Sequence, residues 1–149
     1  MTLPVALLLL ISQACNTIVE KQENTESDPS EQAIFPKGEL GPATNFTGNA
    51  YNFGLVANDS IYNTLVGNVY FEQSARSNWH LHPSGQILIV LDGSGYHQLE
   101  GQPRQTMKKG DVIKVPANIR HWHGATENTA LTQMYILPKG FQVLQDIMP

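Results

Sequence analysis

The sequence is poor in cysteine, in charge and in long apolar runs. Cys15 is the only cysteine among 149 residues, which excludes an intrachain disulfide. The apolar run from Leu3 to Ile11 is broken by Pro4, and it is too short to span a bilayer as a helix, which takes about 20 residues. With 41% hydrophobic residues, a chain of this length suffices for one globular domain and not for two.

Charge is sparse and unevenly placed along the chain. Residues 16 to 32 hold five acidic residues against Lys21 alone, which accounts for the whole formal net charge of −4. From Ala33 onward, eight lysines and arginines balance eight aspartates and glutamates. A neutral domain without a basic stripe offers no electrostatic footprint for a phosphate backbone, so nucleic acid is excluded as a partner.

The first fifteen residues resemble a bacterial lipoprotein signal. A short apolar run leads to Ser12-Gln13-Ala14-Cys15, and in such signals the cysteine becomes the lipid-modified first residue of the mature chain. The resemblance implies export to the periplasm or the cell surface, with a lipid on Cys15 as the one membrane contact. Secretion without a lipid, and a buried N-terminal segment with an incidental thiol, are the alternatives.

Residues 16 to 33 (NTIVEKQENTESDPSEQA) are polar and acidic, with almost no large apolar side chains after Val19. Such a segment cannot bury enough surface to offset the entropy of ordering it. We expect a flexible acidic linker, which would hold a domain formed by residues 34 to 149 away from a membrane. An ordinary disordered tail would have the same composition.

From Ile34 the pattern changes to short β-type runs separated by Gly, Pro, Asn and Asp. This spacing is typical of a small all-β sandwich or barrel. Turn chemistry is strongest at Asp92-Gly93-Ser94-Gly95 and Glu100-Gly101-Gln102-Pro103. A helical turn is expected only in Gly140 to Pro149. The predicted strands are Ala50 to Ala57, Tyr62 to Glu72, Ser77 to His82, Gln86 to Leu91, Gly95 to Glu100, Gln105 to Lys108, Asp111 to Val115, His121 to Thr126 and Ala130 to Leu137.

In the run from Gln86 to Leu91, every position after the glutamine is aliphatic. This is expected of a strand covered on both faces. The barrel interior covers one face, and either a second sheet or a partner subunit covers the other. A homodimer is therefore possible, and the sequence does not choose between the two covers.

Four of the five histidines form two pairs, His80-Leu81-His82 and His121-Trp122-His123. Side chains two apart on a strand point to the same face, so both rings of a pair can face one cavity. By the same alternation, Trp79 and Trp122 point away from the histidines and are predicted to be packing residues. The fifth histidine, His97, has no partner nearby in the sequence and is predicted to lie on a surface hairpin.

The spacing around these pairs resembles the two motifs of the cupin superfamily, over roughly Gly67 to Leu137. The matching segments are Trp79-His80-Leu81-His82-Pro83-Ser84-Gly85-Gln86 with Gly93, and Gly110-Asp111-Val112-Ile113-Lys114-Val115-Pro116 with His121. Four motif positions differ. Ser74 replaces the first glycine, Gln86 the glutamate, Asn118 the middle glycine and Ala125 the final asparagine. Asn118 is an easy exchange, because asparagine tolerates the left-handed conformation of a tight turn.

The resemblance implies a single-domain cupin, a small double-stranded β-helix or jelly-roll barrel, with one divalent metal. The implied ligands are His80, His82, Gln86 and His121. Three nitrogens and one oxygen on a concave β interior leave coordination positions open for a substrate. Imidazole suits Mn, Fe, Co, Ni and Zn alike.

Within the cupins, the segment around these ligands is similar to small bacterial manganese-dependent hydroxynitrile lyases and to cupins associated with carboxymuconolactone decarboxylase domains. This similarity favours manganese. Those lyases carry a histidine where this chain has Gln133, and an amide is no proton acceptor near neutral pH. His123, on the same face as His121, can take that role, and a structural histidine is the alternative. His123 and Gln133 are therefore the candidate catalytic residues.

The sequence thus predicts a metal-dependent lyase or isomerase, in which the metal acts as a Lewis acid on a small oxygen-bearing substrate. A non-catalytic module that binds a sugar or another small molecule, and a metal-dependent dioxygenase, are the alternatives. The pocket lining is expected to include Val69, Leu88, Gln133 and Leu137. This mostly apolar lining favours a small, weakly polar substrate.

Overall fold

The computed structural model describes residues 33–57, 59–138 and 144–145. Every regular element in this part of the chain is a β-strand, and none of it is a helix that could cross a membrane. Cys15, residues 16–32 of the acidic linker and most of the predicted C-terminal helical turn lie outside the described residues. Within that last segment, Leu144–Gln145 form a short strand.

The strands confirm the all-β prediction, and each predicted strand contains observed strand residues. In the described part they are β1 (Glu39–Leu40), β2 (Phe46–Thr47), β3 (Ala50–Val56), β4 (Thr64–Phe71), β5 (Arg76–Ser77), β6 (His80–Leu81), β7 (Gln86–Leu99), β8 (Gln105–Lys108), β9 (Val112–Val115), β10 (His121–Ala125), β11 (Leu131–Pro138) and β12 (Leu144–Gln145).

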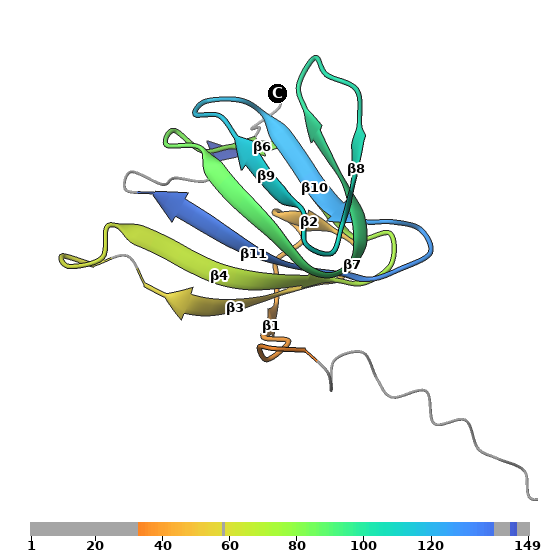
Figure 1. Cartoon of the computed structure of the whole chain (residues 1–149), viewed down its shortest axis with the longest axis horizontal. Helices are drawn as coiled ribbons and strands as arrows, with labels where there is room; N and C mark the ends of the chain where they lie inside the picture. The colour runs from red at the N-terminus through yellow and green to blue at the C-terminus, as the bar shows by residue number, and fades with distance from the viewer. Residues whose placement is uncertain (1–32, 58, 139–143, 146–149) are drawn as a thin grey trace, which may run out of the picture.

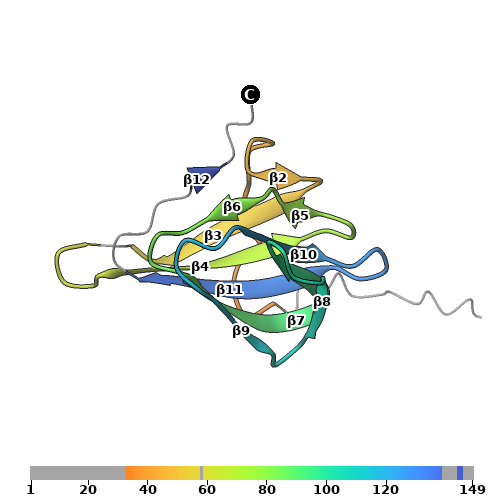
Figure 2. The ribbon, with the colours of Figure 1, turned by 90° about the horizontal axis from the view of Figure 1, so that it is seen from above.

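All pairings are antiparallel, and the strands form two faces of one curled sheet. One face has the order β1-β3-β4-β11-β7, with β9 also paired to β7. The other is built by β10, β5 and β2, with β6 beside β10 and β12 beside β6. Figure 1 and the turned view in Figure 2 show β6 and β10 lying across from β4 and β11. This is the jelly-roll barrel that the sequence predicts.

The long strand β7 joins the two faces. Its first half pairs with β9 and β11, and its second half pairs with β8 and β10. The change occurs near Gly93, which has a φ of 74°, and the register with β11 shifts between Thr132 and Gln133. Irregularities of this kind let a strand bend from one sheet into another. The predicted turn at Asp92 to Gly95 is therefore wrong as a strand end, because the glycines bend the strand without ending it.

The apolar core closes one end of the barrel. Its buried members are Ala50, Val69, Phe71, Ala75, Val90, Met107, Ala125 and Leu131. Strand register places Ala50, Phe71 and Leu131 in one row across β3, β4 and β11. The opposite end, where β7 begins at Gln86, is lined by buried polar side chains instead. The core thus fixes the barrel and leaves its other end for a site.

The aliphatic run in β7 alternates in burial. Gln86, Leu88 and Val90 are buried, whereas the side chains between them are only partly buried. Val112, paired with Ile89, is 56% exposed. This outer face is thus partly exposed in the described part of the chain, and the homodimer stays a prediction.

We expect Gly93→Ala to destabilise the protein by more than Gly101→Ala. Both glycines have a φ of 74°, which costs an L-residue about 1–2 kcal/mol. At Gly93 an added methyl would also overlap the carbonyl oxygen of Ala130, whereas at Gly101 nothing lies within 4 Å. Urea denaturation measures the difference in the free energy of unfolding. Equal losses would contradict the close approach of β7 to Ala130.

Candidate metal centre

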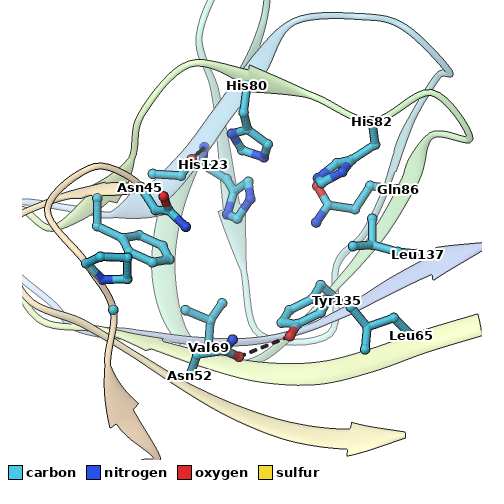
Figure 3. A pocket seen from close by; sticks show the side chains of 14 residues that line it. Asn45, Asn52, Leu65, Val69, His80, His82, Gln86, His123, Tyr135 and Leu137 are labelled. Carbon is cyan, nitrogen blue, oxygen red and sulfur yellow. Dashed lines mark hydrogen bonds between the residues drawn. The ribbon is translucent and has the colours of Figure 1, made fainter. Parts of the chain in front are cut away.

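His80 and His82 enter the site from β6 and from the residue beside its end. Both rings are buried, and Figure 3 shows them pointing into one cavity together with Gln86. A turn follows at once, in which the Gly85 amide donates to the His82 carbonyl over 3.1 Å and Gly85 has a φ of 76°. This turn sends the chain into β7, so that Gln86 is the first residue of that strand and faces the histidines.

His121 reaches the same place from β10. It pairs directly with His80 across the two strands. The turn before it contains Asn118, which has a φ of 60°, and the Asn118 amide donates to the His82 carbonyl over 3.0 Å. The left-handed conformation expected of Asn118 is confirmed. Its backbone also ties together the two turns that carry the predicted ligands.

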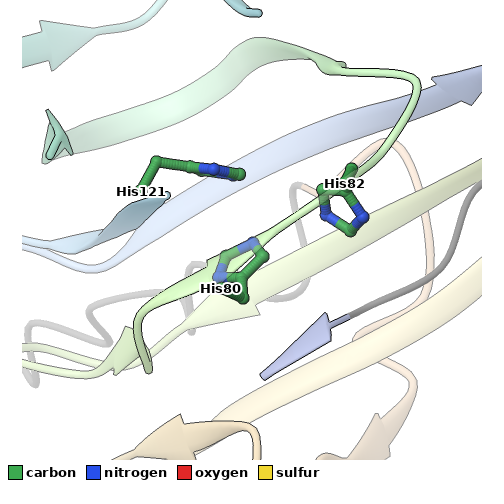
Figure 4. A group of neighbouring side chains, drawn as sticks. All are labelled: His80, His82 and His121. Atoms are coloured by element: carbon green, nitrogen blue, oxygen red, sulfur yellow. The ribbon is translucent and has the colours of Figure 1, made fainter. Parts of the chain in front are cut away.

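The four predicted ligands therefore meet. One ligand nitrogen each of His80, His82 and His121 lies within 4.8 Å of the others, and the three rings face a common space (Figure 4). Gln86 Oε1 lies 2.9 Å from His121 Nε2. All four side chains are at most 7% exposed. This cluster is suited to hold a single metal ion with imidazole and amide ligands.

The contacts of His121 suit a metal ion at the site. Its Nδ1 lies 3.0 Å from the Ile119 carbonyl oxygen, while its Nε2 faces Gln86 Oε1. Burial, followed by the charge of His80, lowers the pKa of His121 to about 3, so the ring is neutral near pH 7. A neutral ring has one N–H and can satisfy only one of two oxygens. A metal ion between Nε2 and Oε1 would remove this conflict.

The His80 ring is also oriented by a hydrogen bond to a backbone carbonyl. Its Nδ1 donates to the Asn78 carbonyl over 2.8 Å, which leaves the lone pair of a neutral ring on Nε2. Burial lowers the pKa of His80 and so favours the neutral form that a metal requires. Backbone carbonyls that orient metal-binding imidazoles in this way are a common feature of metal sites.

His123 lies next to this cluster and is held by Gln133. The Gln133 amide nitrogen is 2.7 Å from His123 Nδ1, and both side chains are buried. Because the amide donates, Nδ1 accepts and the ring proton lies on Nε2. Burial keeps the pKa of His123 well below its usual value. His123 is therefore a neutral hydrogen-bond donor beside the metal ligands, with its ring centroid 5.5 Å from that of His80.

The surface position predicted for His97 is wrong. The residue is 7% exposed and stands directly opposite His123 in the pairing of β7 with β10. Directly paired residues point to the same face, so His97 faces the interior. The error follows from the turn expected at Asp92 to Gly95, because the continuous β7 brings His97 into register with the second histidine pair.

Trp79 and Trp122 are packing residues, as predicted, and they contact each other. Their rings meet edge to face with centroids 6.5 Å apart, and Trp122 Nε1 donates to Gln98 Oε1 over 2.9 Å. Trp122 is 8% exposed. This packing covers the side of β10 that faces away from the ligands.

A cavity of about 240 Å³ opens beside the ligands. Val69 and Leu137 line it, as expected from the sequence. Leu88 and Gln133 are fully buried and contribute no surface to it. Sequence reasoning missed Tyr135 and Asn52, which line the cavity on β11 and β3. Alternation along β11 gives a signal for Tyr135, which lies two residues from Gln133 and from Leu137, but Asn52 has no local signal.

Comparisons with known proteins agree with this architecture. The cupin domain family matches residues 67–137. An (R)-mandelonitrile lyase from Granulicella tundricola is 40% identical over 96 residues, which cover 64% of this chain and 73% of the lyase. A cupin-like protein from Thermotoga maritima has a crystal structure that matches with a TM-score of 0.72 at 40% identity, covering 78% of this chain and 91% of that one. This chain belongs to the cupin family.

The cupin also resembles a protein with a different activity. Acireductone dioxygenase from Gallus gallus is 39% identical over 59 residues, which cover 37% of the cupin and 33% of the dioxygenase. A lyase and a dioxygenase thus share sequence with the same barrel. Family membership therefore supports the fold and a three-histidine pocket that can bind a metal, while the reaction has to be argued from this cupin's own site.

Two departures from the cupin motifs are explained by backbone geometry. Ser74 and Asn118 stand where the motifs have glycine, and they are the two non-glycine residues with positive φ in the described chain, at 65° and 60°. Their conformations are those that glycine adopts readily. The turns are therefore kept although the glycines are not.

We expect the metal-free protein to lose stability as the pH falls below about 6.5. Burial lowers the pKa values of His80, His97, His121 and His123 in the folded state. Between 6.5 and these lowered values the unfolded chain binds more protons, so the free energy of unfolding falls by up to about 1.4 kcal/mol per pH unit for each histidine. Urea denaturation at about pH 7 and about pH 5.5, above the range of most carboxylates, measures the change. Equal stability at both values would contradict the burial of these rings.

Proposed function

We propose that this cupin binds one divalent metal, manganese in preference to iron, zinc, nickel or cobalt, through His80, His82, Gln86 and His121. We further propose that it catalyses a lyase or isomerase reaction on a small oxygen-bearing substrate. The observation that carries the proposal is the buried cluster of His80, His82 and His121, whose ligand nitrogens lie within 4.8 Å of one another. The lyase relative supports the reaction class.

The neutral amide of Gln86 sets the charge of the site. When bound, the metal supplies a Lewis acid that polarises a hydroxyl or carbonyl oxygen. A glutamate at this position would cancel part of the metal's charge, and Gln86 does not. At an effective dielectric constant of 20, one unit charge at 4 Å is worth about 4 kcal/mol, which is an upper bound on the difference for an anionic ligand. The cupin therefore favours developing negative charge on the substrate.

His123 supplies the second group at the site. Held by Gln133 with its proton on Nε2, it lines the cavity as a donor. In this tautomer Nε2–H donates a hydrogen bond to negative charge on the substrate, and Nε2 does not act as a base. The sequence predicts His123 as the proton carrier and Gln133 as the residue that weakens the lyase analogy. We infer that Gln133 acts as a positioning residue, which fixes the tautomer of His123.

The proposal is tested with the full-length protein loaded with manganese. We expect one metal per chain and release of benzaldehyde and cyanide from mandelonitrile faster than without protein. Metal binding and product release should both be lost in His80→Ala and His121→Ala. The control is His97→Gln, which should keep the metal because His97 is buried but is not one of the proposed ligands. Circular dichroism checks that the variants fold. A wild-type protein that binds no manganese or iron would overturn the proposal.

The same preparation separates the alternatives. Oxygen uptake with a substrate, measured with an electrode, would replace the lyase by a dioxygenase. Sugar binding without turnover would replace it by a binding module. Either result would leave the metal site in place and contradict the proposed reaction.

Gln86→Glu is a nearly isosteric test of the charge argument. We expect metal affinity to rise, by up to about a thousandfold if the full 4 kcal/mol is realised, and metal-dependent turnover to fall. Competition with a chelator measures the affinity. A variant with higher affinity and unchanged turnover would show that the neutral ligand is not needed for the reaction.

A further inference from the structure

The cavity has a second polar end that the metal centre does not use. Tyr135 on β11 and Asn52 on β3 lie on the sheet face opposite the one that carries β6 and its histidines. Figure 3 shows their polar ends across the cavity from His80 and His82, with Val69 and Leu65 beside them. The cavity is therefore polar at both ends and apolar between them.

Tyr135 and Asn52 form a complementary pair. The Tyr135 hydroxyl donates to Asn52 Oδ1 over 3.1 Å. This leaves the phenol oxygen as an acceptor and the Asn52 NH2 group as a donor. Burial raises the pKa of Tyr135, so the phenol is neutral at pH 7. A hydroxyl group placed here can donate to one partner and accept from the other.

A glycine leaves the space that the Tyr135 ring occupies. Gly67 pairs directly with Tyr135 across β4 and β11, and a methyl group at Gly67 would overlap the phenol ring and its oxygen. At Gly54, which stands opposite Gly67 on β3, a methyl group would meet nothing within 4 Å. The phenol oxygen is the Tyr135 atom nearest to that position, so Gly67 leaves room for the hydroxyl that reaches Asn52.

The lining also restricts the charge of the ligand. Among the described residues that line the cavity there is no lysine, arginine, aspartate or glutamate. An ionised group at the end away from the metal would therefore find no opposite charge among these residues. The cavity volume of about 240 Å³ also lies below that of pockets for drug-sized ligands, which start at about 300 Å³.

We propose that Tyr135 and Asn52 form a second anchoring point, and that the substrate is a compact neutral molecule with two oxygen groups. One oxygen lies at the metal and the other, a hydroxyl, lies between the Tyr135 phenol and the Asn52 amide. This inference rests on the proposed function, because it places the first oxygen at the metal ligands. It adds the class of substrate that the reaction accepts.

Unreactive probes test the anchor without requiring turnover. Benzyl alcohol has one oxygen, 3- and 4-hydroxybenzyl alcohol have a second oxygen at two distances, and 4-(hydroxymethyl)benzoate carries a charge instead. Their affinities for the manganese-loaded full-length protein follow from the paramagnetic broadening of their proton signals. We expect at least one hydroxybenzyl alcohol to bind about two- to tenfold more tightly than benzyl alcohol, the effect of one net hydrogen bond, and the benzoate to bind more weakly.

Variants test whether the tighter binding of the hydroxylated probe comes from Tyr135 and Asn52. Tyr135→Phe should abolish the preference for the hydroxylated probe and leave benzyl alcohol binding unchanged. Gly67→Ala should do the same by displacing the ring, whereas Gly54→Ala, its matched control, should behave as wild type. The methylene protons should broaden more than the ring protons beside the phenol hydroxyl, since the anchor holds that end away from the metal.

The outcomes separate this inference from the proposed function. Equal affinity of all neutral probes, or a preference that survives in Tyr135→Phe, would overturn the anchor while manganese-dependent broadening still supports the metal site. Tighter binding of the benzoate would overturn the neutral-substrate class. No broadening of any probe in the presence of manganese would overturn the metal site, and this inference with it.

Discussion

The structure depends on keeping a group of neutral, electron-pair-donating side chains buried together. His80, His121 and Gln86 bring nitrogen and oxygen atoms together in one buried place, and burial keeps the pKa values of these two rings low. Such a group gains little from hydrophobic packing, and a cation would satisfy the His121 nitrogen and the Gln86 oxygen that face each other. The cupin therefore combines a stable apolar core at one end with a costly polar cluster at the other, as expected where function determines the residues.

The backbone makes this cluster possible by joining two turns to one long strand. The His82 carbonyl accepts from both Gly85 and Asn118, so the turns after the first ligand pair and before His121 are held to each other. Gln86 begins β7, which then bends near Gly93 and crosses into the other face of the barrel. One strand thus carries a ligand at one end and closes the core further along. Positioning of the site and stability of the barrel are coupled through β7.

Features of the fold and the site that depend on local periodicity can be predicted from the sequence. Period-two spacing predicted that His80 and His82 face one cavity, and turn chemistry predicted the left-handed Asn118. It failed where contacts are long-range. His97 was misplaced because a bend in β7 has the same glycine-rich composition as a turn. Asn52 was missed because only strand pairing brings β3 beside the cavity. The short strands β1, β2 and β12 have too few residues for any pattern to show.

The most direct test is anomalous X-ray diffraction from crystals grown with manganese, recorded on both sides of the manganese absorption edge. The account predicts one anomalous peak at coordinating distance, about 2 Å, from Nε2 of His80 and His121, from a ring nitrogen of His82 and from Oε1 of Gln86. A site without such a peak, in which the Gln86 amide turns its NH2 group toward His121 Nε2, would contradict it. In that case an internal hydrogen bond, and no metal, would explain the buried cluster.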